Sequence, residues 1–149
     1  MHVKLEKDLS VQGIEIYIKY AEMNKDVERI ATMLQSISTR IKCMGEDSEK
    51  FTNLADIYYF ESVDKVTFAY CEKEVYRTDL RLYQIVDDFA HLGFVQISRA
   101  CVLNINFLDS ITPLLNSRME ATLHNSERLY VTRKYLKDIK LALQEGMQK

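Results

Sequence analysis

Proline and glycine are scarce in this chain of 149 residues, which has one proline and four glycines. Long disordered linkers are enriched in such residues, so the composition argues against them. The longest uncharged runs, residues 30–39 and 89–98, are about half of the roughly 18 residues that a membrane-spanning helix needs. The start of the chain alternates charged and apolar residues and does not resemble a signal peptide. We therefore expect a cytoplasmic protein with an ordinary core, because 47% of its residues are hydrophobic.

Cysteine and histidine are also few and widely spaced. The three cysteines, Cys43, Cys71 and Cys101, match neither a disulfide framework nor a zinc-binding pattern, and their odd number favours reduced thiols. The three histidines lie far apart, so no metal site is expected. The sequence has no glycine-rich phosphate loop, and Ser98 has no evident His–Asp partner. We therefore expect no cofactor, no small-molecule substrate and no enzymatic activity.

Charge is unevenly distributed, although the net charge is only −2. Residues 1–64 carry 8 basic and 12 acidic side chains, whereas residues 65–149 carry 12 basic and 10 acidic ones. Between residues 118 and 140, six basic side chains stand against three acidic ones. Such a stretch indicates either a surface for an anionic partner or an ordinary solvated helix face, and charge alone does not decide between them.

Residues 1–48 predict a small ββα unit. Apolar and polar residues alternate over residues 2–7 and 13–20, which is typical of two half-buried strands. From Asn24 to Met44 the apolar residues recur at steps of three and four, which predicts an amphipathic helix. The same stripe is a short heptad seam, so it either packs on its own hairpin or pairs with a second copy. We expect the domain boundary in the acidic segment that follows.

Strand signals dominate residues 51–149, which we expect to fold as a second domain. Runs rich in Tyr, Phe, Val and Ile predict strands at 56–61, 65–71, 74–77, 94–98, 107–113, 119–124 and 128–132. Helical spacing returns over residues 79–91, which Gly93 ends, and over residues 133–145. A tight hairpin turn is expected at Asn125-Ser126. The fold class is therefore mainly β, or α+β when the N-terminal unit is included.

Two arginines stand out because each one follows a predicted strand. Arg99 comes directly after residues 94–98, and Arg133 separates a strand from the last helix. Burying an unpaired guanidinium costs several kcal/mol, so each arginine must be paired or must project into solvent. One interpretation is that the arginines bind an anionic partner, because a planar guanidinium can donate two parallel hydrogen bonds to such a group. The other is a surface ion pair with Glu61 or Asp109.

Four segments, in this order, resemble the LytTR family of bacterial DNA-binding domains. They are DIYYFES (56–62), FVQISRACVLNINFL (94–108), LLNSRMEATL (114–123) and LYVTRKYL (129–136). The resemblance covers residues 54–143 and implies an elongated β-sheet domain of about ten strands, whose loops enter successive major grooves. It implies a sequence-specific transcriptional regulator that binds double-stranded DNA, and we expect this regulator to bind repeated sites as a homodimer.

The resemblance also assigns roles to individual residues. Base contacts are implied for Arg99 after its strand, for Arg133 at the strand–helix junction, and for the hairpin around Lys65 and Thr67. Ser98 precedes Arg99 in a triplet that is Ser-Arg-Ala here and His-Arg-Ser in many family members. Phosphate contacts are expected from three further basic residues, which are Arg118, Lys134 and Lys137. Arg118 has the alternative role of solvating the turn beside it.

Many family members carry a phosphoacceptor receiver domain ahead of the DNA-binding part. Only about 50 residues precede that part here, too few for a doubly wound receiver. We therefore expect a stand-alone regulator, similar to short family members encoded beside a small membrane protein, which is then an expected partner. The alternative is a protein-interaction module or antagonist that pairs with or sequesters another regulator through residues 1–48.

Overall fold

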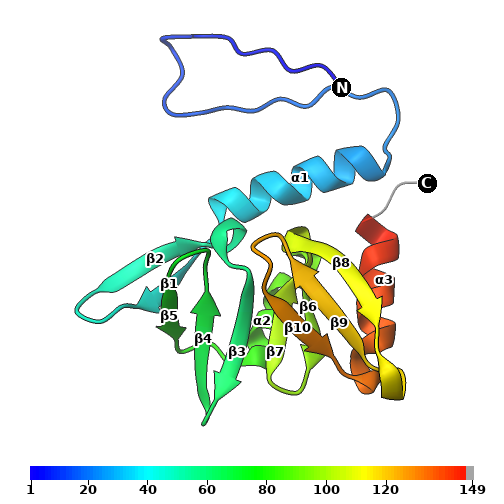
Figure 1. Cartoon of the computed structure of the whole chain (residues 1–149). Coiled ribbons are helices and arrows are strands. Elements are labelled where there is room, and N and C mark those ends of the chain that lie inside the picture. The colour runs from blue at the N-terminus through cyan, green and yellow to red at the C-terminus, as the bar shows by residue number, and fades with distance from the viewer. Residues whose placement is uncertain (147–149) are drawn as a thin grey trace.

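The computed structural model describes the backbone of residues 1–146 and the side chains of residues 1–143. Its helices are α1 (Lys25–Ser38), α2 (Leu82–Phe89) and α3 (Leu136–Gly146). The strands of the larger sheet are β1 (Arg40–Met44), β2 (Glu49–Asn53), β3 (Tyr59–Val63), β4 (Val66–Tyr70), β5 (Val75–Thr78), β6 (Phe94–Ser98) and β7 (Cys101–Asn104). The strands of the smaller sheet are β8 (Leu108–Pro113), β9 (Met119–Leu123) and β10 (Arg128–Val131). The described chain is therefore mainly β with three α-helices, as the sequence predicts (Figure 1).

Both sheets are antiparallel and are built largely from hairpins. The strand order is β2-β1-β5-β4-β3-β7-β6 in the larger sheet and β10-β9-β8 in the smaller one. β6 has the bounds that the sequence predicts, and the other strands predicted after residue 51 begin and end within three residues of their predictions. Gly93 ends the helical segment before β6 with a φ of +99°, which confirms its predicted role.

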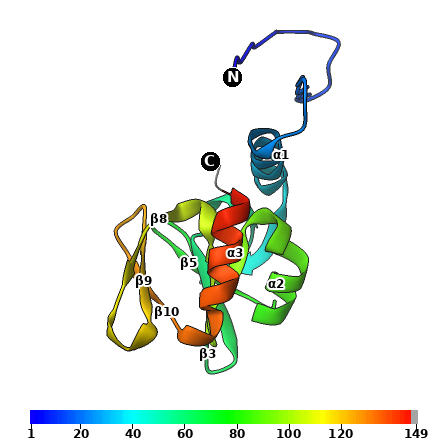
Figure 2. The same ribbon diagram turned by 90° about the vertical axis from the view of Figure 1, so that its right-hand side faces the viewer.

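Residues 1–24 differ from the prediction. None of them lies in a strand, so the strands expected at 2–7 and 13–20 are wrong. The segment extends away from the sheets, and apolar side chains such as Leu5 and Ile14 are about nine-tenths exposed (Figure 1; Figure 2). A two-stranded hairpin with no further sheet or helix to cover it is at best marginally stable in water. The sequence alternates as a strand does, but the apolar side chains of this segment do not pack against the sheets in the described structure.

The helix predicted from Asn24 starts as expected and ends early. Asn24 is its N-cap, and its Oδ1 atom accepts a hydrogen bond from the Val27 N–H at 3.0 Å. The helix stops at Ser38, six residues before the predicted end, where the Ser38 and Thr39 hydroxyls both donate to the Gln35 carbonyl. Hydroxyls that bond a carbonyl in the preceding turn compete with the helical ladder, which explains the end.

Residues 40–44 form β1, although the sequence pattern assigned them to the helix. Ile41 and Cys43 are buried while Lys42 between them is exposed, so the true period here is two. β1 pairs with β2 along its length and with β5 through Met44 and Arg77. The boundary expected between residues 48 and 51 therefore falls inside a hairpin of the larger sheet.

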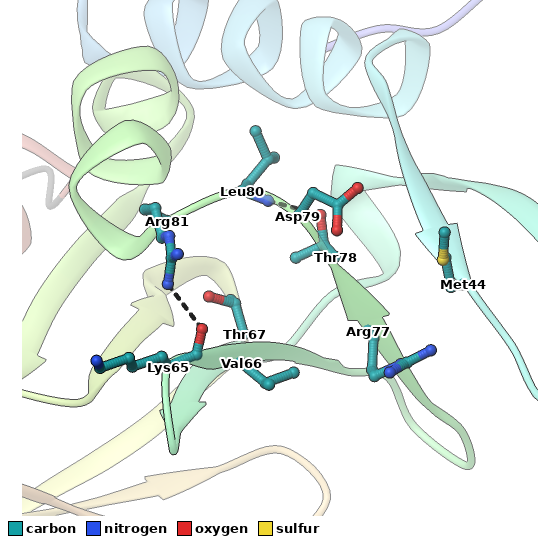
Figure 3. A pocket seen from close by; sticks show the side chains of 9 residues that line it. All are labelled: Met44, Lys65, Val66, Thr67, Arg77, Thr78, Asp79, Leu80 and Arg81. Atoms are coloured by element: carbon teal, nitrogen blue, oxygen red, sulfur yellow. Dashed lines mark hydrogen bonds between the residues drawn. The ribbon is translucent and has the colours of Figure 1, made fainter.

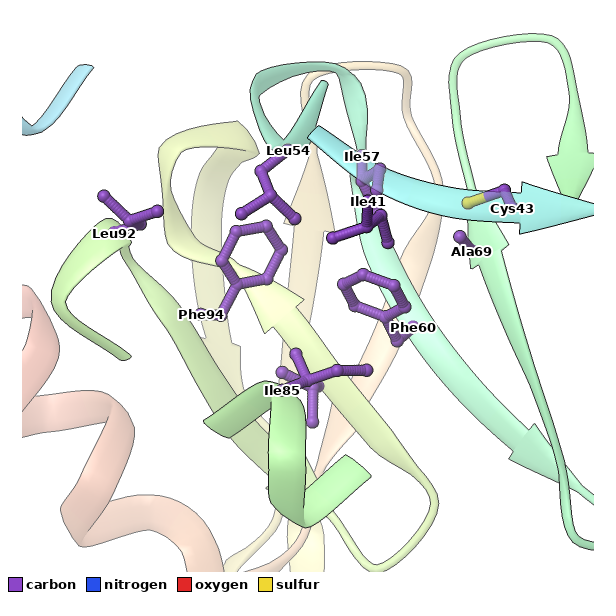
Figure 4. Close-up of a cluster of buried hydrophobic side chains, with 10 residues drawn as sticks. Ile41, Cys43, Leu54, Ile57, Phe60, Ala69, Ile85, Leu92 and Phe94 are labelled. Carbon is purple, nitrogen blue, oxygen red and sulfur yellow. The ribbon is translucent and has the colours of Figure 1, made fainter. Parts of the chain in front are cut away.

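The sequence did not reveal β7, because all four of its side chains are buried. A strand covered on both faces shows no alternation, so its signal is weak. Two clusters of buried side chains hold the sheets together. One packs between the larger sheet and α2 (Figure 4) and contains Ile41, Cys43, Leu54, Ile57, Phe60, Ala69, Ile85, Leu92, Phe94 and Val102. The other lies among the two sheets and α3 and contains Tyr58, Tyr59, Ile97, Cys101, Leu103, Ala121, Leu123, Val131 and Ile139.

Three strands contribute to both clusters, and they are β3, β6 and β7. Buried side chains on both faces fix these strands more firmly than a one-sided sheet does. The turns at their ends are therefore carried by the best-packed part of the molecule.

Candidate nucleic-acid interface

The β3–β4 turn and the β6–β7 turn lie next to each other at one edge of the larger sheet (Figure 1). β3 pairs antiparallel with β7, so the end of β3 meets the start of β7. The Ser62 N–H donates to the Ala100 carbonyl at 2.8 Å and joins the two turns directly. Lys65 in the first turn and Arg99 in the second are 34 residues apart in sequence and are brought to the same edge.

The smaller sheet and α3 bring three more cations to this edge. The Thr132 N–H donates to the Ile97 carbonyl at 2.9 Å, which places the end of β10 beside the end of β6. Arg133 and Lys134 follow at once, in the short 3₁₀ turn that leads into α3. β9 runs antiparallel to β10, so Arg118, one residue before β9, lies at the same end.

Arg81 joins the same edge and was missed by the sequence prediction. Its Nη1 atom donates to the Lys65 carbonyl at 2.7 Å (Figure 3). The second helix was expected to begin at residue 79, but it begins at Leu82 with Arg81 as its N-cap residue. Arginine is not among the residues that favour a helix N-cap, so the sequence alone gives no signal for this position. We call the following six residues the basic edge: Lys65, Arg81, Arg99, Arg118, Arg133 and Lys134.

All six side chains of the basic edge are exposed. Within residues 1–143 none of them forms an ion pair, because the salt bridges in that part of the chain involve Lys25, Lys42, Lys50 and Arg128. Glu61, which was an alternative partner for Arg99, accepts instead a hydrogen bond from the Tyr70 hydroxyl at 3.3 Å. The ion-pair alternative for Arg99 and Arg133 is therefore not what the described structure contains.

Two of these cations lie over aromatic rings. The Arg118 guanidinium is 5.5 Å from the centroid of the Tyr130 ring, and the Lys134 Nζ atom is 5.6 Å from that of Tyr135. Contacts of this kind at exposed sites are weak, but they restrict the cation to one side of the ring. Neither contact neutralises the charge, so both cations keep a positive charge at the surface.

The other predicted site residues have less exposed or less central positions. Thr67 is only 3% exposed, in β4 opposite Thr78. Ser98 is half-buried, and its Oγ atom accepts a hydrogen bond from the Ala100 N–H at 3.4 Å across the turn that carries Arg99. Lys137 is exposed on α3, about one turn beyond Lys134. The structure thus groups Lys65, Ser98, Arg99, Arg118, Arg133 and Lys134 at one edge and leaves the Thr67 side chain inside the sheet.

A cavity of about 330 Å³ lies under the β3–β4 turn (Figure 3). Its lining includes Lys65, Thr67, Arg77, Thr78 and Arg81. In Figure 3 the Arg81 guanidinium points to the turn, whereas the Arg77 guanidinium points away from it. The cations around this cavity therefore do not converge on one point inside it.

The three cysteines are free in the structure. Burial raises the pKa of Cys43, and burial together with nearby Cys43 and Asp56 raises the pKa of Cys71 to about 11. Thiols with raised pKa values are protonated at neutral pH and are poor nucleophiles. Within the described residues, no group of His, Cys, Asp and Glu could hold a metal ion. No helix in that part of the chain is long and apolar enough to span a membrane.

Comparisons with known proteins show the family and the fold of this chain. The sequence model of the LytTr DNA-binding domain family matches residues 47–144. An uncharacterised HTH-type transcriptional regulator of Staphylococcus aureus strain NCTC 8325 is 22% identical over 142 residues, which cover 93% of this chain and 96% of the relative. The sensory transduction protein LytT of Bacillus cereus is 28% identical over 98 residues, which cover 66% of this chain and 40% of LytT.

A solved structure with the same fold is a LytTr DNA-binding domain from Bacillus cereus, from a protein described as a methyl-accepting/DNA response regulator. The two share a TM-score of 0.67 at 20% sequence identity, over 70% of this chain and 96% of that chain. Although one relative is named HTH-type, strands separate all three α-helices of this chain within residues 1–146. The part of the chain that the structure describes therefore contains no helix-turn-helix.

Proposed function

We propose that this chain, which belongs to the LytTr DNA-binding domain family, regulates transcription. It does so by inserting the turns of the basic edge into the major groove of duplex DNA. The observation that carries the proposal is the gathering of six exposed cations on neighbouring turns and one helix start, without carboxylate partners in the described residues. Phosphates supply most of the affinity for such a surface. The major groove is wide enough to admit a two-stranded hairpin end.

The residues of the basic edge divide into two kinds of contact. Arg99 follows directly on β6 and Arg133 comes two residues after β10, and their planar forks suit the O6 and N7 acceptors of guanine. Lys65 approaches from the neighbouring turn. Three other cations, Arg118, Lys134 and Lys137, contact phosphates and set the position of the protein on DNA. Ser98 and Thr67 support the backbone of the turns, since their side chains are half-buried and buried.

Selection of bound fragments from random duplex DNA tests the proposal most directly. We expect an enriched motif at moderate salt, with affinity that falls steeply as the salt concentration rises because neutralised phosphates release their counterions. Binding that shows the salt dependence but no enriched motif would leave a DNA-binding protein without sequence preference. No binding at low salt would contradict the proposal.

Alanine variants separate the two kinds of contact. Arg99→Ala and Arg133→Ala should each cost about 1–3 kcal/mol on the selected site and relax the preference at one base position. Lys137→Ala should weaken binding to all sequences alike, since a phosphate contact carries no base information. Equal and uniform losses for the three variants would show that the two arginines contact only phosphate.

The proposal includes a homodimer on repeated sites, and residues 1–24 are its proposed contact. They carry large apolar side chains that are mostly solvent-exposed, such as Leu5, Leu9 and Ile14, and they extend from the end of the molecule opposite the basic edge (Figure 1). Exposed apolar groups of this extent are characteristic of protein-contact surfaces. A partner bound there leaves the basic edge free, and a dimer supplies the second half-site.

Sedimentation of the full chain and of a chain that starts at Asn24 tests this part. Asn24 is the right starting point because the helix cap and β1 are both retained, whereas a start near Phe51 would remove the buried residues Ile41 and Cys43. We expect a dimer that the truncation dissociates. If both chains are monomers at tens of micromolar, the exposed segment instead favours the alternative function, an interaction module for a different protein.

A further inference from the structure

We propose that Arg81 is a positioning residue of the DNA interface, which holds the β3–β4 turn so that the Lys65 side chain projects from the basic edge. The proposal rests on the proposed function for the contact between Lys65 and DNA. Its structural basis is the bond from Arg81 Nη1 to the Lys65 carbonyl, at 2.7 Å (Figure 3). A hydrogen bond from a guanidinium is shorter and stronger than one between neutral groups.

The turn needs support because of its backbone conformation. Val63 pairs with Val66, so only Asp64 and Lys65 lie in the turn, and their φ angles are +50° and +67°. Two-residue hairpin turns with both φ angles positive favour Asn-Gly or Asp-Gly, since side chains disfavour the left-handed region. Asp tolerates this region, whereas Lys does not do so readily. A residue in such a conformation persists where surrounding contacts hold it.

Arg81 is itself well anchored and can provide that support. Its N–H donates to Gln84 Oε1 at 2.8 Å, and its carbonyl accepts the first bond of α2 from Ile85 at 3.1 Å. Ile85 is fully buried in the cluster between α2 and the larger sheet. The chain of contacts thus runs from the core, through the start of α2 and the Arg81 guanidinium, to the turn.

Arg77 is a matched control for Arg81. Both are exposed arginines that line the same cavity, so replacing either one removes one positive charge from the lining of that cavity. Arg77 lies on β5, and within the described residues its side chain makes no hydrogen bond to the turn. A purely electrostatic role predicts similar effects for the two substitutions, whereas a positioning role predicts different ones.

A double-mutant cycle between Arg81 and Lys65 tests the proposal on DNA. Arg81→Ala and Lys65→Ala should each weaken binding by about tenfold, and the double variant should lose about tenfold rather than about a hundredfold, because both changes remove one contact. Arg81→Met, which keeps the aliphatic stem without the donors, should behave as Arg81→Ala does. Additive losses would show that Arg81 contacts DNA by itself, and no loss in Arg81→Ala would show that the turn needs no support; either result overturns the proposal.

Hydrogen exchange of the amides of residues 63–67, measured without DNA, keeps the test independent of the proposed function. Exchange should become faster in Arg81→Ala and Arg81→Met and stay unchanged in Arg77→Ala, while the urea midpoint of all three variants stays close to that of the parent chain. Unchanged exchange in both Arg81 variants overturns the proposal. If exchange is faster in the Arg81 variants but Lys65→Ala binds DNA with full affinity, Arg81 still holds the turn. Lys65 then does not contact DNA, and that part of the proposal is overturned.

Discussion

At the scale of single residues, the best-supported polar side chain is Asn104 at the end of β7. It is 1% exposed, and its Nδ2 atom donates to the Ile57 carbonyl at 2.9 Å and to the Leu54 carbonyl at 3.5 Å. Its Oδ1 atom accepts from the N–H and the Nδ2 of Asn106, at 3.1 and 3.0 Å. One amide therefore ties the end of β7 to the chain that enters β3, at the end of these strands opposite the basic edge.

Asn104→Leu should destabilise the protein by about 2–3 kcal/mol, because it removes a buried amide that bonds two carbonyls and two Asn106 donors. Urea unfolding measures the change. Asn53→Ala is the control, since Asn53 precedes a 3₁₀ turn without a side-chain cap bond, and its effect should be within about 0.5 kcal/mol. Similar losses of unfolding free energy for the two variants would show that the hydrogen bonds of Asn104 do not stabilise the protein.

Single residues also show which features of the site can be predicted from the sequence. The sequence predicts Arg99 and Arg133 as candidate contacts because each follows a predicted strand, and position after a strand is local information. Gly93 was identified for a similar reason, and a Cβ atom there would lie 3.0 Å from Asn106 Nδ2. Arg81 was not identifiable, because its role depends on a bond to Lys65, sixteen residues away across the fold.

At the scale of elements, the segment from α1 to β1 shows why a correct pattern gave a wrong assignment. Apolar residues continue at helical spacing through Ile37 and Ile41, so the pattern contains no visible stop. The end of α1 is set by hydroxyl bonds at Ser38 and Thr39 and by the sheet pairing of β1. Tertiary pairing overrides local spacing in short segments, and no proline or glycine marks the change.

Ile37 and Ile41 provide a test of this assignment. A continuous helix places both on one stripe, whereas the structure leaves Ile37 55% exposed and Ile41 6% exposed. Ile41→Ala should cost about 2–4 kcal/mol, since it leaves a cavity in the core, and Ile37→Ala should cost below about 1 kcal/mol. Urea unfolding of both variants measures the difference. Equal losses would favour the continuous helix.

At the scale of the whole molecule, the two opposite ends of the fold carry different kinds of side chain. The basic edge lies at one end, and α1 with residues 1–24 lies at the other (Figure 1). The charge difference between the halves of the sequence indicated some such division. Its spatial form depends on the pairing of β3 with β7 and on the bond between Thr132 and Ile97, which join segments distant in sequence. Local patterns carry no information about such pairs, so the edge itself was not predictable.

The junction of the two sheets gives the molecule a defined response to alkaline pH. Burial, with the carboxylate of Glu127, raises the pKa of Tyr59, and burial with the carboxylate of Glu61 raises the pKa values of Tyr70 and Cys101. Cys71 has a pKa of about 11 instead of the ordinary 9.0. A raised pKa means that the folded state keeps its proton when the unfolded state has lost it. The stabilisation is therefore complete below the ordinary pKa and is lost above it.

The free energy of unfolding should therefore be nearly constant from pH 7 to about pH 8.5 and should fall between about pH 9 and pH 11. Cys71 alone should contribute roughly 1–2 kcal/mol to this fall, because its thiol ionises near pH 9 in the unfolded chain and near pH 11 in the folded one. Urea midpoints at a series of pH values measure the decline, and Cys71→Ala should reduce its first part, between pH 9 and pH 10. A midpoint that stays constant through pH 11 would show that these groups ionise as readily in the folded protein as in the unfolded chain.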